Sequence, residues 1–394
     1  MTRKEFIKVC ATLGISIPFL PTAFSCNNND DSTVSSGFSG SVLIIGAGAA
    51  GMSSAFLLAQ QGIDFQILEA SSTYGGRMKH NTSFADFPIP LGAEWLHVDT
   101  SELTTIVNDA STNITTQTQG YQESDTVGFY DGTYSESTIL NEFGNFEDKK
   151  FVNSSWLDFF ETYIVPSIQS NFQFNIQITA INYEADKVVV TDSNGGIYEA
   201  DKVIITVPLK ILQNNVIGFT PSLPATKLQV IQNAPIWGGI KVFIEFTQKF
   251  YPTFLSFPDS ETQTGQRLYY DASYAQNTSK HILGLFAVGA QAEQYQNLSG
   301  TAQRDYILNE LDTIFNGMAT QSYVNHIVQN WNDEPYIEAA YLADIASSNI
   351  STALSTSVED KLYFAGDAYT QEDDWGAVHN ATQSARDVVT EIIV

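Results

Sequence analysis

Hydrophobic positions near the start of the folded chain form two short runs with a longer segment between them. Residues 42–45 are an apolar run that predicts a buried strand, and residues 65–68 predict a second strand, which ends on Glu69. Residues 52–61 between them are compatible with a helix. A strand, a helix and a second strand in this order predict a parallel sheet.

Strand patterning returns in the middle of the chain. The hydrophobic pattern predicts a small meander, with a turn at residues 192–196 and strands over residues 174–183, 187–191 and 197–200. Residues 201–207 follow as a buried strand that ends at a proline. These strands extend the sheet content of the chain well beyond its first hundred residues.

Two helices are predicted in the second half of the chain. Residues 303–315 carry an apolar stripe at helical spacing, and residues 382–393 form a second helical segment. Residues 101–150 are instead rich in Thr, Ser, Asn, Gln and Asp, and their periodicity is poor. We therefore expect short elements and loops in that region, as parts of a second domain.

The composition indicates a folded and acidic protein. Of the 394 residues, 43% are hydrophobic and 12% are aromatic, which is enough to build a large core. The formal net charge of -26 excludes nucleic acid as a partner, because phosphates would be repelled. The same charge tolerates a cationic substrate. The five histidines have no metal-ligand spacing, so we predict no metal site.

The first residues have the layout of a bacterial export signal. Residues 1–26 combine basic residues with an apolar run at 9–20 that is too short to span a bilayer. Residues 2–8 resemble a twin-arginine signal, and Cys26 follows small residues as at a lipoprotein cleavage site. Residues 27–40 then form a flexible tether. We expect a periplasmic or outer-membrane protein that touches the membrane only through a lipid on Cys26; plain secretion is the alternative.

The turn between the first strand and the first helix carries three glycines in the spacing G-x-G-x-x-G. Gly46 allows a tight turn, Gly48 lets the backbone approach a pyrophosphate, and Gly51 lets helix and strand pack closely. Free N–H groups at the helix N-terminus would face the phosphates. Glu69 stands where an acid accepts hydrogen bonds from a ribose. The pattern predicts dinucleotide binding, with a simple glycine-rich turn as the alternative.

Further short motifs follow the glycine turn and recur at the end of the chain. Residues 75–77 read Gly-Gly-Arg, which places a guanidinium near a phosphate, and residues 91–97 read Leu-Gly-Ala-Glu-Trp-Leu-His. Together with the glycine turn, these motifs resemble the flavin-containing amine oxidase family. That family covers monoamine oxidases, polyamine oxidases and lysine-specific histone demethylases. Residues 362–370 and 375–381 resemble closing motifs of the same family.

The resemblance implies an α/β fold, with a discontinuous Rossmann-type FAD-binding domain and a smaller α+β substrate domain. It also implies that FAD is bound non-covalently, because Ala340 stands where monoamine oxidases attach the flavin to a cysteine. The predicted FAD-binding domain comprises residues 41–100, 172–235 and 355–394 and the substrate domain residues 101–171 and 236–354.

The same resemblance implies a set of cofactor contacts. Asp367 replaces the usual glutamate and would accept a hydrogen bond from the ribityl chain, while Val188 or Val189 would contact the cofactor through the backbone. Glu94 could instead recognise a cationic substrate, or be an acid at the surface or behind the residues that contact the ligand. The predicted contacts are Gly46, Gly48, Ala50, Gly51, Glu69, Ala70, Gly76, Arg77, Gly92, Ala93, Glu94, Trp95, Val188, Val189, Gly366, Asp367, Ala377 and Val378.

Three residues are predicted to serve the reaction itself. The resemblance implies that Lys241 holds a water against flavin N5; from the residues alone, a solvent-facing lysine at a strand edge is the alternative. Tyr341 would be one wall of an aromatic cage around the amine, or else a core tyrosine. Ala377 replaces the second cage aromatic, so Trp375 is the candidate for the other wall. His97 matches a histidine at the pocket mouth of some polyamine oxidases, or is structural.

The implied function is that of an FAD-dependent amine oxidase. Hydride would pass from the carbon beside the amine nitrogen to flavin N5, the imine would hydrolyse, and O2 or another acceptor would reoxidise the flavin. One alternative is a flavin desaturase of a carotenoid- or porphyrin-like substrate, and another is a flavin-binding lipoprotein without turnover. Lys241 and the motif at residues 331–341 speak against the desaturase, because both belong to the amine branch. Monoamines, polyamines and amino acids all stay open as substrates.

Overall fold

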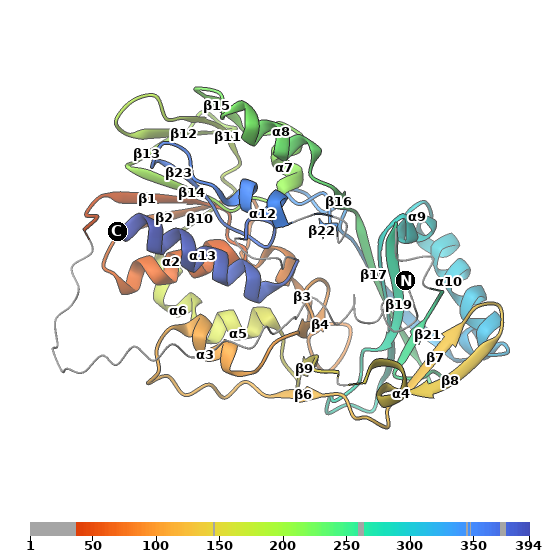
Figure 1. The fold of residues 1–394 in the computed structure, drawn as a ribbon. Helices are drawn as coiled ribbons and strands as arrows, with labels where there is room; N and C mark the ends of the chain where they lie inside the picture. The colour runs from red at the N-terminus through yellow and green to blue at the C-terminus, as the bar shows by residue number, and fades with distance from the viewer. Residues whose placement is uncertain (1–36, 145, 259–263, 344–345, 347, 371–375) are drawn as a thin grey trace.

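Two large sheets organise the structure (Figure 1). The predicted export signal and Cys26 lie outside the described residues, so the expectations for them stay predictions. Within the part of the chain that is described, no helix is long and apolar enough to cross a bilayer. The computed structural model describes residues 37–144, 146–258, 264–343, 346, 348–370 and 376–394.

The first sheet is parallel and contains the predicted strand–helix–strand unit. The central strand β1 pairs with β2 on one side and with β14 on the other. The sheet order is that of a doubly wound fold, which binds ligands beyond the carboxyl ends of the strands, where the order reverses. The predicted α/β fold of Rossmann type is confirmed. The strands lie in the order β10 (Phe172–Phe174), β2 (Asp64–Glu69), β1 (Ser41–Ile45), β14 (Lys202–Ile205) and β23 (Leu362–Phe364).

Apolar side chains cover both faces of this sheet, because successive residues of a strand point to opposite faces. On one face, α2 (Ala49–Gln60) and α13 (Val378–Ile393) pack against each other and against Ile44 and Ile67 (Figure 1). Helix α13 begins four residues earlier than predicted. The opposite face, with Leu43, packs on α7 (Leu209–Gln213), α8 (Ala225–Asn233), α12 (Ser348–Ser355) and a four-stranded sheet in the order β13 (Ile197–Ala200), β12 (Val188–Asp192), β11 (Ile178–Asn182) and β15 (Gly218–Thr220).

The second large sheet has seven strands and stands beside the first (Figure 1). Helices α9 (Ala290–Gln296), α10 (Gly300–Ile314) and α11 (Met318–Ser322) cover one of its faces. Its other face carries aromatic side chains that include Phe243 and Tyr270. The strands lie in the order β21 (Tyr323–Asn330), β17 (Gly239–Phe246), β20 (His281–Gly289), β19 (Gly265–Asp271), β18 (Phe254–Ser256), β7 (Thr126–Tyr130) and β8 (Tyr134–Thr138).

The segment with poor periodicity forms short elements, as expected. Its helices are α3 (Ser101–Val107) and α4 (Ile139–Phe143), and its strand β9 (Lys149–Phe151) pairs with β5 (Trp95–Leu96) and β6 (Thr118–Gly120). Apolar residues of α3, together with α5 (Trp156–Tyr163) and α6 (Val165–Ile168), belong to the same core as α2. These helices therefore pack with the parallel sheet, although we assigned residues 101–171 to the substrate domain. The division into domains stays a prediction.

Candidate active site

A cavity of about 380 Å³ is lined by residues of both large sheets. We call its two ends the glycine end, where β1, β2 and α2 meet, and the lysine end, lined by β17, β19 and β20. The glycine end lies beyond the carboxyl end of β1, which is the ligand position of a doubly wound sheet. The predicted contacts that line the cavity are Gly46, Gly48, Ala50, Glu69, Ala70, Gly76, Arg77, Gly92, Ala93, Glu94, Trp95, Gly366, Asp367, Ala377 and Val378.

The glycine turn has the close packing that its spacing predicts. Gly46 has a φ of +107°, and a Cβ at Gly51 would lie 2.0 Å from the carbonyl oxygen of Gly46. Gly51 itself does not line the cavity; its role is to let α2 approach β1. A Cβ at Gly48 would meet nothing within 4 Å, so the turn leaves open space at that point. Gly48 also makes no side-chain cap, so the first N–H groups of α2 are free for an anion.

The carboxylate of Glu69 lies at the end of β2 beside this turn. It accepts hydrogen bonds from the backbone N–H of Ala47 at 2.6 Å and of Ser71 at 2.8 Å. Burial raises the pKa of Glu69, and the two backbone hydrogen bonds only partly oppose that effect. Sequence analysis assigned Glu69 as the acceptor of hydrogen bonds from a ribose. The structure shows that two backbone N–H groups hold its carboxylate at the cavity wall.

Arg77 and Asp367 come from distant parts of the chain and meet at the cavity wall. The guanidinium donates to both carboxylate oxygens, over 2.9 and 2.5 Å, and also to the carbonyl of Ala340. A Cβ at Gly92 would lie 1.9 Å from the carbonyl oxygen of Arg77, so only glycine fits beside the arginine. Both charged groups line the cavity, and each balances the charge of the other.

A second helix N-terminus points at the cavity. Ala377 is the N-cap of α13 and makes no side-chain cap, and Ala377, Val378 and Ala381 line the cavity wall. Two helix N-termini, those of α2 and α13, therefore give the cavity a positive potential from backbone groups. A flavin dinucleotide, with a pyrophosphate and an electron-accepting ring, fits this arrangement.

The expectation for Val188 and Val189 is corrected by the structure. Both lie in β12, and neither lines the cavity. Val188 is fully buried in the core beneath the parallel sheet. The segment that reaches the cavity is residues 176–178, at the start of β11. The sequence pattern identified the meander correctly, but it did not show which of its strands faces the ligand.

Lys241 is buried at the lysine end and is not the solvent-facing lysine of the alternative reading. Side chains alternate along β17, so Lys241 shares with Phe243 the face that carries Tyr270. Its Nζ lies 2.7 Å from Oε2 of Glu94, which also accepts a hydrogen bond from the Tyr270 hydroxyl. Burial lowers the pKa of Lys241, although Glu94 opposes that shift. The Glu94 carboxylate thus accepts a hydrogen bond from Lys241 and stabilises its charged form.

Tyr341 lines the cavity on the short strand β22 (Tyr341–Leu342), which pairs with β16 (Ile236–Trp237). Its ring meets that of Trp237 edge-on, with 6.3 Å between the centroids. A Cβ at Gly376 would lie 3.4 Å from the Tyr341 ring, so the chain just before Ala377 passes beside the tyrosine. Trp375, the other predicted wall, lies outside the described residues.

His97 lines the cavity together with an acid that sequence reasoning did not find. Nδ1 of His97 lies 3.0 Å from Oδ1 of Asp148, and Asp148 is buried. Phe146 and Leu268 add apolar surface to the cavity wall. Asp148 lies in the segment with poor periodicity, where no sequence signal marked it. Among the described residues, no cluster of His, Cys, Asp and Glu could hold a metal ion.

The parallel sheet and the cavity beyond its carboxyl edge define a protein of the class that binds a dinucleotide. The sequence model described as "Flavin containing amine oxidoreductase" matches residues 161–393, and the one described as "NAD(P)-binding Rossmann-like domain" matches residues 44–110. The first match covers more than half of the chain. The protein belongs to the flavin-containing amine oxidoreductase family, whose members are FAD-dependent enzymes.

Curated relatives include plant proteins of two kinds. The chain is 27% identical over 216 residues to polyamine oxidase 4 of Oryza sativa subsp. japonica, which covers 54% of this chain and 43% of that protein. It is 28% identical over 210 residues to lysine-specific histone demethylase 1 homolog 3 of Arabidopsis thaliana, which covers 52% of this chain and 13% of that protein. The match thus spans less than half the length of these relatives.

Solved structures share the fold over 90% of this chain. A triple mutant of putrescine oxidase aligns with a TM-score of 0.73 at 15% identity, over 90% of this chain and 99% of its own. Cyclohexylamine oxidase from Brevibacterium oxydans aligns with the same TM-score, identity and coverage. At this level of identity, the likeness shows the fold.

Proposed function

We propose that this protein is an FAD-dependent amine oxidase that holds its cofactor non-covalently. The observation that carries the proposal is a single cavity that joins the glycine turn to the buried Lys241 and to Tyr341. When bound, FAD would accept hydride from the carbon beside the amine nitrogen and pass two electrons on to O2 or another acceptor.

The residues at the glycine end would hold the dinucleotide. The N-terminus of α2 would bind the pyrophosphate, and Glu69 would accept hydrogen bonds from the ribose. The N-terminus of α13 would stabilise negative charge on the ring system. Ala340 offers no nucleophile for a covalent link.

The lysine end would hold the amine. The Tyr341 ring and apolar residues such as Phe286 exclude water, and an aromatic face favours the positive charge that builds on nitrogen. The buried Asp148, paired with His97, adds negative potential to the same cavity. Lys241 would orient a water or the substrate nitrogen by hydrogen bonding. Trp375 is proposed as a second wall around the amine.

An anaerobic titration of the purified protein tests this proposal. Monoamines, diamines, polyamines and amino acids are added in turn, and the oxidised flavin absorbance is followed. We expect one amine class to bleach the flavin, and Lys241→Met to slow the reduction or the reoxidation. A flavin that no amine reduces would contradict the proposal, and flavin that stays with acid-precipitated protein would contradict non-covalent binding.

A further inference from the structure

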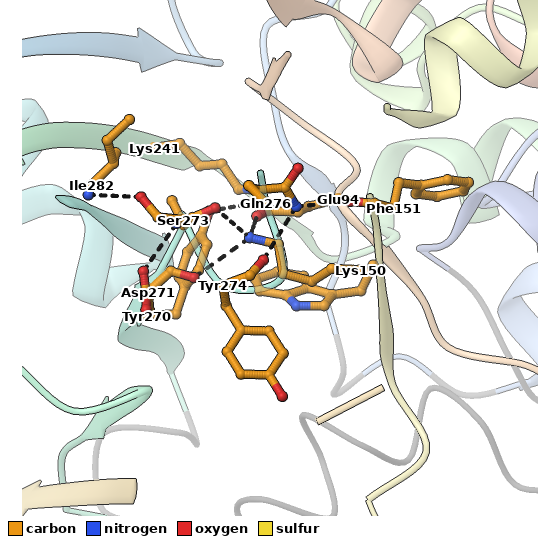
Figure 2. Close-up of polar contacts among 12 residues, drawn as sticks. Glu94, Lys150, Phe151, Lys241, Tyr270, Asp271, Ser273, Tyr274, Gln276 and Ile282 are labelled. Carbon is orange, nitrogen blue, oxygen red and sulfur yellow. Dashed lines mark hydrogen bonds and ion pairs between the residues drawn. The ribbon is translucent and has the colours of Figure 1, made fainter. Parts of the chain in front are cut away.

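Behind Lys241, the side chains of Glu94, Lys150 and Tyr270 form a buried cluster, of which the sequence motifs marked only Glu94 (Figure 2). Glu94 and Lys150 are each only 3% exposed, and Tyr270 is fully buried. Glu94 directly precedes β5, Lys150 is on β9 and Tyr270 is on β19, so the cluster comes from three separate segments of the chain. Lys241 and Glu94 line the cavity, whereas Lys150 does not.

The two lysines hold opposite oxygens of one carboxylate. Nζ of Lys241 lies 2.7 Å from Oε2 of Glu94, and Nζ of Lys150 lies 3.0 Å from Oε1. The contact of Lys150 with Oε1 is an ion pair without a hydrogen bond, because Nζ of Lys150 donates to the carbonyl of Ala272 at 2.8 Å, with the carbonyl of Asp271 at 3.5 Å (Figure 2). The Glu94 carboxylate thus connects a lysine at the cavity wall to one behind it.

The charges of this cluster do not balance. Two ammonium groups and one carboxylate carry a net charge of about +1, which is costly to bury. Lys150 has backbone carbonyls as further acceptors, whereas Glu94 is the one hydrogen-bond acceptor of Lys241 among the described residues. The face of Trp95, 5.1 Å from Nζ of Lys241, is a weaker substitute. The charge of Lys241 therefore has fewer hydrogen-bond acceptors to stabilise it than the charge of Lys150 has.

We propose that Glu94 and Lys150 are positioning residues that act through Lys241. Glu94 fixes the orientation of the Lys241 amine by accepting its hydrogen bond. Lys150 neutralises part of the Glu94 charge from the side away from the cavity. Lys241 at the cavity wall therefore compensates only part of that charge. The inference depends on the proposed function in one respect, which is the role of Lys241 in the reaction. The coupling among the three side chains is a property of the protein without cofactor.

The direction of the coupling follows from the charges around Lys241. Burial lowers the pKa of Lys241, Glu94 raises it, and Lys150 lowers it further. The same two lysines outweigh burial at Glu94 and keep the pKa of that carboxyl low. Burial and the Glu94 charge raise the pKa of Tyr270, which stays a donor. The other titratable groups around the cluster are Tyr121, Asp148, His97, Asp271 and Lys249.

Lysine ionisation in the apoprotein tests the proposal directly. Protein labelled with 13C at lysine Cε is titrated by NMR, and Lys241→Met identifies the Lys241 signal. In Lys150→Met, we expect the Lys241 titration to move up by about one pH unit, because Glu94 is then balanced by Lys241 alone. In Glu94→Gln, we expect it to move down by about the same amount. Opposite shifts in the two variants would show that the charges of Lys150 and Glu94 both act on Lys241.

Lys280→Met is the matched control. Lys280 pairs with Glu245 at 2.9 Å on the same sheet, and neither residue lines the cavity. Its loss should leave the Lys241 titration unchanged. An unmoved Lys241 signal in Lys150→Met, or an equal shift in Lys280→Met, would overturn the proposal. Should Glu94→Gln not fold, the double variant Glu94→Gln with Lys150→Met removes both charges, and Lys241 must then titrate below its position in Lys150→Met.

The holoenzyme provides the second measurement. The pH profile of the step that Lys241→Met slows should shift up in Lys150→Met, by the amount seen in the apoprotein. Shifts in the NMR titration without any amine oxidation would leave the coupling intact and refute the proposed function. Amine oxidation with an unmoved Lys241 titration would refute the coupling and leave the function standing.

Discussion

The two ends of the cavity are built by different means. At the glycine end, backbone groups form most of the site, namely the turn at Gly46 and Gly48 and the N-termini of α2 and α13. At the lysine end, side chains form the site, and Lys241 binds Glu94, which lies 147 positions away in the sequence. The first kind of site depends on local spacing, whereas the second depends on the whole fold being in place.

The carboxylates of the half-buried Glu69 and the buried Glu94, one at each end, show the difference. Burial raises the pKa of Glu69, because its partners are neutral backbone N–H groups. At Glu94, burial acts in the same direction, but two lysines outweigh it and the pKa is lowered. Removing the charge of each acid should therefore affect stability in opposite pH ranges.

The largest expected effect is that of Glu94→Gln on stability. The change leaves two buried ammonium groups without a carboxylate, so we expect the free energy of unfolding at neutral pH to fall by about 3–5 kcal/mol. Because the folded-state pKa of Glu94 is depressed, its contribution is present above the unfolded pKa and is lost as the pH falls through the folded pKa. Urea unfolding at several pH values measures both.

Glu245→Gln is the control for that prediction. Glu245 pairs with the partly exposed Lys280, so its loss should cost about 1 kcal/mol or less. Lys150→Met added to Glu94→Gln should restore part of the stability, because it removes one of the two uncompensated charges. A Glu94→Gln variant as stable as the Glu245→Gln variant would mean that the lysine end does not depend on the Glu94 charge.

Two glycine substitutions separate folding from cofactor binding at the other end. Gly51→Ala places a Cβ 2.0 Å from the Gly46 carbonyl oxygen, so we expect the apoprotein to lose about 3 kcal/mol of stability. Gly48→Ala meets nothing within 4 Å, so the apoprotein should keep its stability while FAD binding weakens at least about tenfold. Thermal unfolding and FAD titration of the apoprotein measure the two effects.

Gly120→Ala is the matched control, because its Cβ would lie 4.0 Å from the nearest atom, on Lys149, away from the cavity. Both its stability and its affinity for FAD should stay unchanged. Equal losses of apoprotein stability in Gly48→Ala and Gly51→Ala would contradict the assignment of Gly51 to packing and of Gly48 to cofactor binding.

Sequence reasoning predicted the glycine end better than the lysine end, for a physical reason. Turns and helix starts are specified by neighbours in sequence, so residues such as Gly48 and Arg77 could be assigned from short motifs, and they do line the cavity. Lys150 and Asp148 are ordinary charged residues in a segment with poor periodicity, and only tertiary packing gives them partners. The error at Val188 has the same origin, since a strand pattern does not show which strand of a meander faces a ligand.

Tyr341→Ala tests the lysine end from the substrate side. Loss of an aromatic face beside a developing positive charge should cost about 1–2 kcal/mol, or about a tenfold slower reduction of the flavin by amine. Tyr341→Phe keeps the ring and should stay close to the wild type. Stopped-flow reduction of the holoenzyme measures both variants, and a large loss in Tyr341→Phe would instead assign the role to the hydroxyl.

The smallest expected effect is that of Glu69→Gln, and its pH dependence distinguishes the two ends of the cavity most directly. Glu69→Gln replaces an oxygen that accepts from a backbone N–H by an amide, so we expect a loss of about 1 kcal/mol without cofactor. Because the folded-state pKa of Glu69 is raised, its favourable contribution is present below the unfolded pKa and is lost as the pH rises through the folded pKa. The stability difference between wild type and Glu69→Gln should therefore shrink as the pH rises, whereas that of Glu94→Gln should grow. Parallel pH trends for the two variants would mean that charged partners, rather than the backbone, set the ionisation of Glu69.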